Sequence, residues 1–245
     1  MHAEHFSLWV YLAASPLLWL TITVTVYVAA DWMAERSGRH PVVNPVMIAI
    51  VAIAALLLAT GTPYRVYFDG AQFVYFLLGP ATVAIAIPLF KNWPNVRRKA
   101  VPMLAALLVG SSVAIVSAVG VAALGGVPRT VLISLAPKSV TAAVAMSISD
   151  KLGGVPTLTA VLVAITGVLG SIIVTPLMNA MRLRDYAARG FAVGVAAHGI
   201  GAARAFTVDP VAGTFAGIAM GLNAILSSVL VPLFVGLIFP AASGT

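Results

Sequence analysis

Apolar runs long enough to cross a lipid bilayer as helices follow one another along this chain, separated by short polar gaps. Only 9% of the 245 residues are charged and the mean hydropathy is +1.05, so a soluble 25.2 kDa domain could not cover its surface with charge. We therefore expect an all-α integral membrane protein that forms a single polytopic membrane domain over residues 1–245. The apolar runs extend over residues 9–30, 45–60, 72–90, 101–124, 155–181 and 211–239.

Two further stretches, residues 131–150 and 190–206, each carry a basic residue among apolar and helix-disrupting ones. The disrupting residues and their basic neighbours are Pro137 and Lys138 in the first stretch, and Gly199, Gly201 and Arg204 in the second. Non-helical backbone at membrane depth is tolerated only where protein buries it or a watery cavity hydrates it. We therefore expect two broken or re-entrant segments beside a cavity, within about six to eight transmembrane helices.

The basic residues lie mostly in the polar gaps, where they indicate topology better than nucleic-acid binding, although the formal net charge is +7. If residues 131–150 enter and leave on one side, the gaps 31–44, 91–100 and 182–189 share the other side and hold nine Lys and Arg, against three opposite. If residues 131–150 cross fully, the count is seven against five. Because cytoplasmic loops are rich in Lys and Arg, we favour the first arrangement, which leaves the amino terminus outside.

A weak internal repeat relates residues 64–124 to residues 128–181. The run from Val101-Pro102 resembles the run from Val155-Pro156, and a proline-containing segment precedes each of them. A broken segment followed by a span, occurring twice, is typical of transporters built from structural repeats around a midplane site. Whether the repeats are inverted stays open.

The segment around Lys138 has the composition of an anion site. Residues 139–150 are a plausible helix that starts after Pro137, with Ser139 available as its cap and free N–H groups at its positive end. The ammonium of Lys138 and the hydroxyl of Thr141 could bind a carboxylate together with that backbone. The alternative is that Lys138 reaches the membrane interface and binds nothing.

The segment around Arg204 offers a second cation. Its guanidinium could hold a carboxylate by two parallel bonds, with Gly199 and Gly201 allowing close backbone approach. The alternative is a structural ion pair with Asp209. His198 could carry a coupled proton, or be a hydrogen-bonded core histidine. We expect Lys138 and Arg204 to converge on one anion, because neither has an obvious intramembrane carboxylate as partner.

Acidic residues fall at the ends of the apolar segments, so no carboxylate is placed mid-membrane to hold sodium. This favours proton-coupled or uncoupled movement, with His198 and Asp209 as candidates for the proton. No metal or cofactor is expected, and the chain contains no cysteine. Unwound backbone carbonyls could still bind a cation.

Glycines recur every fourth residue at Gly213, Gly217 and Gly221, which predicts close helix packing along the last apolar run. Asn223 and Ser227 follow in helical order. They could line a path or bond across helices, and the pattern does not decide between the two.

Three motifs occur in this order: Leu135-Ala136-Pro137-Lys138-Ser139-Val140-Thr141, Gly153-Gly154-Val155-Pro156-Thr157-Leu158-Thr159-Ala160 and Ala197-His198-Gly199-Ile200-Gly201-Ala202-Ala203-Arg204-Ala205. Together they resemble the LrgB/CidB family of antiholin-like membrane proteins. That resemblance implies a bacterial inner-membrane protein linked to murein hydrolase control and lysis. The family is also related to the plastid glycolate/glycerate transporter, and some members are implicated in pyruvate uptake with a small LrgA/CidA-type membrane partner.

The residues and the resemblance together favour a transporter of small monocarboxylate or hydroxy-acid anions, working by alternating access. The expected binding residues are Lys138, Ser139, Thr141, His198, Gly199, Gly201 and Arg204. The alternative function is a holin-like or antiholin-like pore or regulator of lysis. An enzyme is not expected, because paired carboxylates, a metal cluster and a nucleophile arrangement are not recognisable. The expected partners are a small anion, the lipid bilayer, an LrgA/CidA-type protein and further copies of this chain.

Overall fold

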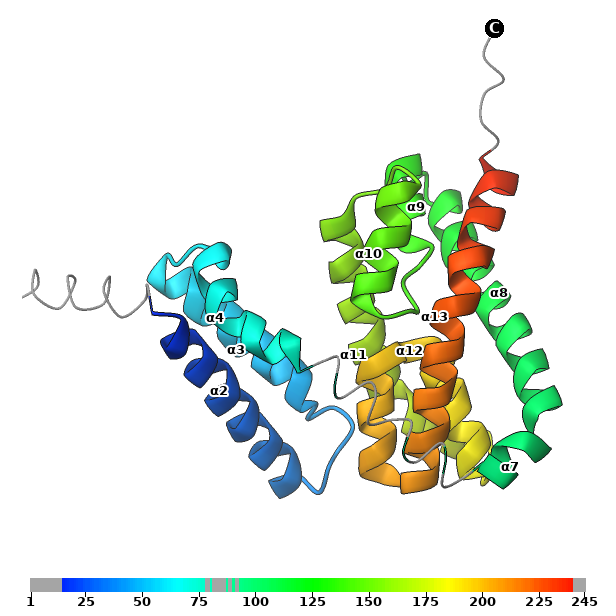
Figure 1. Cartoon of the computed structure of the whole chain (residues 1–245), viewed down its shortest axis with the longest axis horizontal. Coiled ribbons are helices and arrows are strands. Elements are labelled where there is room, and N and C mark those ends of the chain that lie inside the picture. The colour runs from blue at the N-terminus through cyan, green and yellow to red at the C-terminus, as the bar shows by residue number, and fades with distance from the viewer. Residues whose placement is uncertain (1–14, 78–79, 81–86, 88–89, 91–92, 240–245) are drawn as a thin grey trace, which may run out of the picture. The chain divides into compact units, whose positions relative to one another are not determined.

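The computed structural model describes residues 15–77, 80, 87, 90 and 93–239 (Figure 1). Every regular element in this part of the chain is a helix, which confirms the all-α prediction. Five of the described helices are long and apolar enough to cross a membrane: α2 (Pro16–Arg36), α8 (Ala100–Leu124), α11 (Pro156–Ala180), α12 (Tyr186–Val208) and α13 (Pro210–Ile238). The predicted apolar run over residues 72–90 lies only in part within the described residues, and the total number of spans stays a prediction.

The chain divides into two compact units, residues 1–86 and residues 87–245. In the first unit, α2 packs against α3 (Pro45–Thr60) and α4 (Tyr64–Phe76). Trp19 is fully buried and meets the ring of Tyr67 edge to face, and the backbone of Gly70 approaches the same turn of α2 too closely for a side chain. Asn44 begins α3 by accepting bonds from two of its free N–H groups.

The second unit holds both predicted breaks. Its helices are α7 (Trp93–Arg98), α8, α9 (Arg129–Leu135), α10 (Ala142–Lys151), α11, α12 and α13. Of these, α8, α11 and α13 are continuous long helices, whereas α9 and α10 are short and α12 contains non-helical backbone at Ala197 and His198. The two interruptions therefore lie between or beside long helices.

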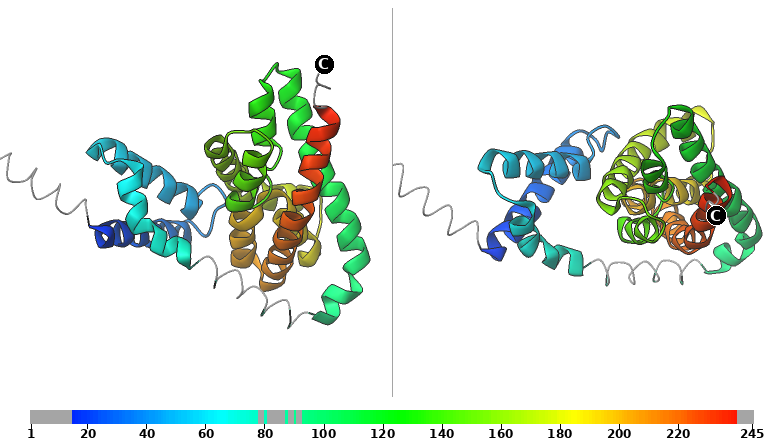
Figure 2. Two further views of the ribbon diagram at one scale, coloured as in Figure 1. Left: turned by 45° about the horizontal axis from the view of Figure 1, so that its top comes forward. Right: turned by 90° about the horizontal axis from the view of Figure 1, so that it is seen from above.

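Two separate apolar clusters mark the two ends of this unit. At one end, the first turns of α8, α12 and α13 pack together through Met103, Phe191 and Phe215. At the other end, the last turns of α8 and α13 pack against α9 and α10, through Ile115, Leu132 and Val235 among others. The helices α8 and α13 thus run in the same direction from the first end to the second (Figures 1 and 2).

The short helices form two hairpins that enter from opposite ends. The first hairpin consists of α9, a loop over residues 136–141 and α10, and it starts and finishes in the cluster at the carboxyl end of α13. The second hairpin is α12, whose arms over residues 186–196 and 199–208 fold back on each other at Ala197 and His198. Gly201 lies against Val193, and Arg204 lines a small cavity together with Arg189, as expected for antiparallel arms.

One ion pair joins the two basic gaps at the amino end of α8. Lys99 donates a 2.7 Å hydrogen bond to Asp185, which also caps α12 by accepting from the N–H of Ala187. Lys99 precedes α8 and Asp185 precedes α12, so the gaps 91–100 and 182–189 meet at one end of this unit. That contact agrees with the arrangement favoured by the charge count.

This contact predicts that both gaps face the same aqueous compartment. Single cysteines replacing the exposed Arg98 and Arg184 should react with an impermeant maleimide from the same side of the membrane. We expect that side to be the cytoplasm, because the gaps are rich in arginine. Labelling of the two positions from opposite sides would contradict the arrangement, and a cysteine in place of Arg129 serves as the control for the other side.

The same ion pair predicts a defined dependence of stability on pH. The hydrogen bond from Lys99 holds the pKa of the Asp185 carboxyl below its usual value. The pair therefore stabilises the fold above the unfolded-state pKa of about 3.9, and loses this contribution as the pH falls through the lower folded-state pKa. Asp185→Asn keeps a capping oxygen but loses the pair. Its melting temperature should be lower than that of the wild type at pH 7, which corresponds to a loss of no more than about 1 kcal/mol of stability. The difference should disappear as the pH falls through the lowered folded-state pKa of Asp185.

Candidate functional site

The first break is a compact loop between α9 and α10. The N–H of Lys138 donates to the carbonyl of Leu135, and the N–H of Val140 donates to the carbonyl of Pro137. Val140 and Ser139 are buried, whereas Lys138 is half-buried and its ammonium donates to the Ser139 hydroxyl at 3.2 Å. The loop thus carries a partly buried cation at the tip of the first hairpin.

The helix after this loop begins later than the sequence predicted. It starts at Ala142 rather than at residue 139, and Thr141, not Ser139, occupies the cap position, with extended backbone and no side-chain cap bond. The turn bond from Val140 to Pro137 keeps residues 137–140 in the loop, and the β-branched Val140 has a slightly lowered helix propensity. The prediction of Ser139 as cap was therefore wrong. The side chain of the actual cap residue, Thr141, accepts no hydrogen bond from the N–H groups at the amino end of α10.

The second break lies at Ala197 and His198 rather than at the glycines that suggested it. His198 has a φ of 41°, in the left-handed region that side chains other than glycine rarely adopt. Gly201 is needed for a different reason: a methyl group there would come within 2.7 Å of Ala197 and 2.9 Å of Val193. Gly199 has more room, because its nearest neighbour would be the sulfur of Met220 at 3.6 Å. The glycines thus let the arms approach, and His198 makes the turn.

The imidazole of His198 is buried in the protein and bonded to its backbone. Nε2–H donates to the carbonyl of Val163 in α11 at 3.0 Å. The ring rests on Gly167, where a methyl group would stand 2.6 Å from the imidazole. This bond places the proton on Nε2 and leaves Nδ1 as the nitrogen that can accept another.

The two breaks are joined through one side chain, Asn223 of α13. Its Nδ2 donates to the carbonyl of Ser139 in the first loop at 3.2 Å and to the carbonyl of Val195, two residues before the second break, at 3.0 Å. Its Oδ1 accepts from the hydroxyls of Ser111 in α8 at 2.6 Å and Ser227 at 3.2 Å. The tips of the two opposed hairpins therefore meet at a buried amide.

The sequence singled out Asn223 and Ser227 but did not assign them a role. The two readings of Asn223 were a polar path and a bond across helices. In the structure Asn223 bonds across helices, to partners 28, 84 and 112 residues away in the chain. An amide in the middle of an apolar run is the one signal that could have marked it, because such a group needs partners at that depth.

Arg204 and Asp209 lie on the second arm and at its end. Arg204 is half-buried, donates to Thr207 at 3.4 Å and lines the small cavity between the arms. It is six residues beyond His198, which is about 9 Å along a helix. Asp209 caps α13 by accepting from the N–H groups of Val211 and Ala212. The convergence of Lys138 and Arg204 on one anion stays a prediction.

The predicted glycine stripe on α13 is only partly used. Gly213 contacts the ring of Phe206 and Gly217 is buried, but Gly221 is exposed and a methyl group there would meet no described atom within 4 Å. The closest approach between α12 and α13 instead uses Gly190 and Gly194 of α12. Each faces the backbone of α13 directly, at Ala212 and Ala216.

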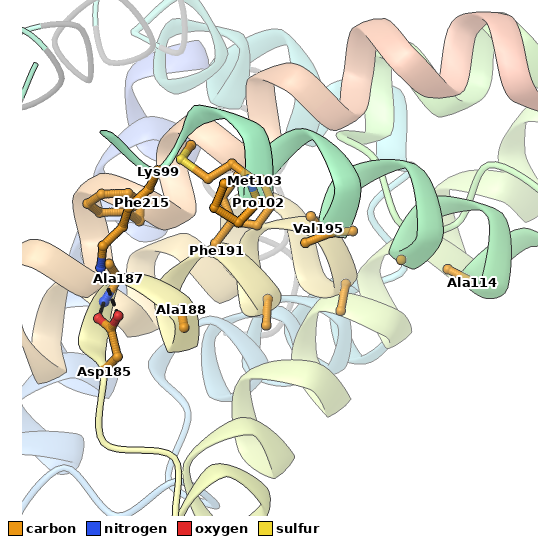
Figure 3. Close-up of a pocket in the computed structure, with 14 residues that line it drawn as sticks. Lys99, Pro102, Met103, Ala114, Asp185, Ala187, Ala188, Phe191, Val195 and Phe215 are labelled. Carbon is orange, nitrogen blue, oxygen red and sulfur yellow. Dashed lines mark hydrogen bonds and ion pairs between the residues drawn. The ribbon is translucent and has the colours of Figure 1, made fainter. Parts of the chain in front are cut away.

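An apolar cavity of about 530 Å³ lies between α8 and α12 (Figure 3). The ion pair of Lys99 and Asp185 stands at one end, and the walls continue to Gly110 and to Val195, whose carbonyl accepts from Asn223. The cavity therefore extends from the ion pair at one end of the unit as far as Val195 and Ala114. Among the described residues no group of three His, Asp or Glu side chains could hold a metal ion.

Comparisons with known proteins agree on one family. The model of the LrgB-like family matches residues 23–237. The chain is 36% identical to the uncharacterized protein YwbG of Bacillus subtilis, over 87% of this chain and 94% of that protein. It is 31% and 32% identical to the holin-like proteins CidB of Staphylococcus epidermidis and Staphylococcus aureus Mu50, in both cases over 91% of this chain and 97% of the relative. No solved structure matches the chain.

The close approach of α12 and α13 predicts a large effect of one methyl group. Gly194→Ala would place its methyl against the backbone of Ala216, which cannot rotate away, and should destabilise the protein by about 1–3 kcal/mol. Gly199→Ala is the matched control in the same helix, because its methyl has room. Thermal unfolding of the purified variants measures both, and equal melting temperatures for the two would contradict the contact.

Proposed function

The chain belongs to the LrgB-like family, and from this premise we propose that it transports small monocarboxylate or hydroxy-acid anions across the bacterial cell membrane. The substrates would be of the glycolate, glycerate or pyruvate class, and the mechanism alternating access. The observation that carries the proposal is the junction at Asn223, where two hairpins from opposite ends of the unit meet with interrupted backbone. Transporters place substrate sites at such interruptions.

The charge at this junction favours an anion. Lys138 lies one residue from Ser139, whose carbonyl binds Asn223, and the amino end of α10 follows three residues later. The free N–H groups there, the ammonium of Lys138 and the hydroxyl of Thr141 form a set of donors for one carboxylate. The substrate's other polar group would then bond to the second hairpin. The carbonyl of a keto acid would accept a hydrogen bond, and the hydroxyl of a hydroxy acid could accept or donate one. Arg204 supplies a second positive charge on that hairpin.

The opposed hairpins suggest how access would alternate. Movement of one hairpin relative to the other would open the junction toward one end of the unit at a time. His198 is the better candidate for a coupled proton, because Nδ1 is the ring nitrogen not bonded to Val163. Asp209 is the weaker one, since its carboxylate already caps α13.

A second function is favoured by the relatives named holin-like protein CidB. A pore or a regulator of lysis would act through assembly of several copies, with or without a small partner membrane protein. It would not require a saturable site at the hairpin junction. Saturable uptake of an acid would therefore support transport, whereas leakage of trapped solutes would support a pore.

Uptake by protein reconstituted in liposomes tests the proposal. Labelled glycolate, glycerate, pyruvate and lactate, each with and without a pH gradient, should identify a substrate with saturable uptake. Lys138→Ala and Arg204→Ala should each reduce that uptake by about ten- to a hundredfold, the value of a charged hydrogen bond. Arg204→Lys should reduce uptake too, because the lysine ammonium lacks the planar pair of N–H donors with which a guanidinium binds a carboxylate.

The matched control is Lys151→Ala, which removes an exposed positive charge from the other end of α10. It should leave uptake unchanged. Release of a trapped fluorescent dye by the wild type, without saturable uptake of any acid, would contradict transport and support the pore.

A further inference from the structure

We propose that Asn223 is a positioning residue that fixes the separation of the two breaks, so that the groups on both hairpin tips form one site only while its amide bridges them. The bridge itself follows from contacts in the fold. Its effect on uptake rests on the proposed transport function.

The bonding capacity of this amide is completely used. Asn223 is 1% exposed, and a side-chain amide offers two N–H donors and two acceptor lone pairs. Both donors are directed to carbonyls, of Ser139 and Val195, and the oxygen accepts from two hydroxyls, of Ser111 and Ser227. No donor or lone pair remains for a ligand, so Asn223 acts on the site through its neighbours.

The two carbonyls fix the orientation of the amide. A carbonyl can only accept, so the NH₂ group must face Ser139 and Val195 at the breaks. The oxygen then faces α8 and the next turn of α13, where the two hydroxyls donate to it. In the reverse orientation, NH₂ would face hydroxyls and the oxygen would face two carbonyls. The four bonds thus support one another.

The carbonyls at the other end explain why two donors are required. A helix end leaves its last carbonyl groups without partners inside the helix, and Val195 lies in the last turn before the break. The carbonyl of Ser139 belongs to the loop between two helices. A buried carbonyl without a partner is costly, and a single side chain satisfies one from each hairpin.

The groups expected to act on a substrate are next to these carbonyls. Lys138 precedes Ser139, and His198 follows Val195 by three residues. These are also the titratable side chains nearest the junction on the first loop and on α12. Their separation is set by the two bonds that Asn223 donates. Without the bridge, each tip would move with its own hairpin.

Distance measurement between spin labels tests the bridge without any transport assay. The chain has no cysteine, so Ala143→Cys and Ala196→Cys place one label on each hairpin, at exposed positions near the breaks. Otherwise unaltered protein should have a narrow distance distribution. Asn223→Leu keeps the branching and the number of non-hydrogen atoms but has no donors or acceptors, and should broaden the distribution or shift it to longer distances.

Two serines one residue apart provide the matched pair. Ser227→Ala removes a hydroxyl that donates to Asn223, whereas Ser228→Ala removes one that donates to the carbonyl of Ala224 in its own helix. Ser227→Ala should broaden the distribution slightly, and Ser228→Ala should not. If Asn223→Leu does not fold, Ser111→Ala carries the test, because it removes the shortest bond to the amide with little change in volume. Distributions of Asn223→Leu or Ser111→Ala identical to that of the unaltered amide would overturn the inference.

Uptake by the same proteins separates this inference from the proposed function. Asn223→Asp keeps the acceptor for both serines but loses two donors, and should raise the KM for the transported acid by about tenfold. The maximal rate should change less, as expected for a residue that positions a binding site. A wild type without uptake of any acid would end the transport proposal and leave the distance result standing. Normal uptake with an altered distance would overturn the positioning role alone.

Discussion

Every polar backbone group at membrane depth needs a partner within the protein, and the second unit of this chain is organised around that requirement. Unbroken helices such as α8 and α13 meet it by themselves. The two hairpins do not, because each interrupts its helical bonds in the interior. The carbonyls exposed in this way accept from Asn223, and the carbonyl of Val163 accepts from His198. Polar side chains in an apolar chain are thus placed where the backbone is broken.

The coarse organisation could be predicted from the sequence because it depends on local properties. Apolar runs fix the long helices, and the position of Pro137 and Lys138 fixes the loop between α9 and α10 to within a few residues. The basic gaps 91–100 and 182–189 were expected on one side, and the bond from Lys99 to Asp185 brings them together. Hydropathy determines whether a segment enters the membrane, and charge determines the side on which a gap lies. Both are properties of the segment itself and can be read from its sequence.

The details of the site could not be predicted, because they depend on which distant backbone faces each residue. Gly199 and Gly201 look alike in the sequence, yet only Gly201 faces another arm closely. Gly221 continues a regular stripe but meets no described neighbour, whereas Gly190 and Gly194 have the same four-residue spacing on α12 and face the backbone of α13. His198 turns the chain although a glycine follows it. Asn223 acquires its role from partners in three other segments.

The contact of Gly190 and Gly194 with α13 has a mechanical consequence. Where two backbones touch without intervening side chains, the interface contains no rotamers that can rearrange, so one helix cannot slide past the other without being lifted off it. The first arm of α12 and the start of α13 must therefore move as one rigid body. The opposite face of that arm borders the 530 Å³ cavity along α8, where side chains such as Met103 and Phe191 make the contacts instead of backbone. The boundary of α12 that can rearrange by side-chain rotation is thus the one with α8.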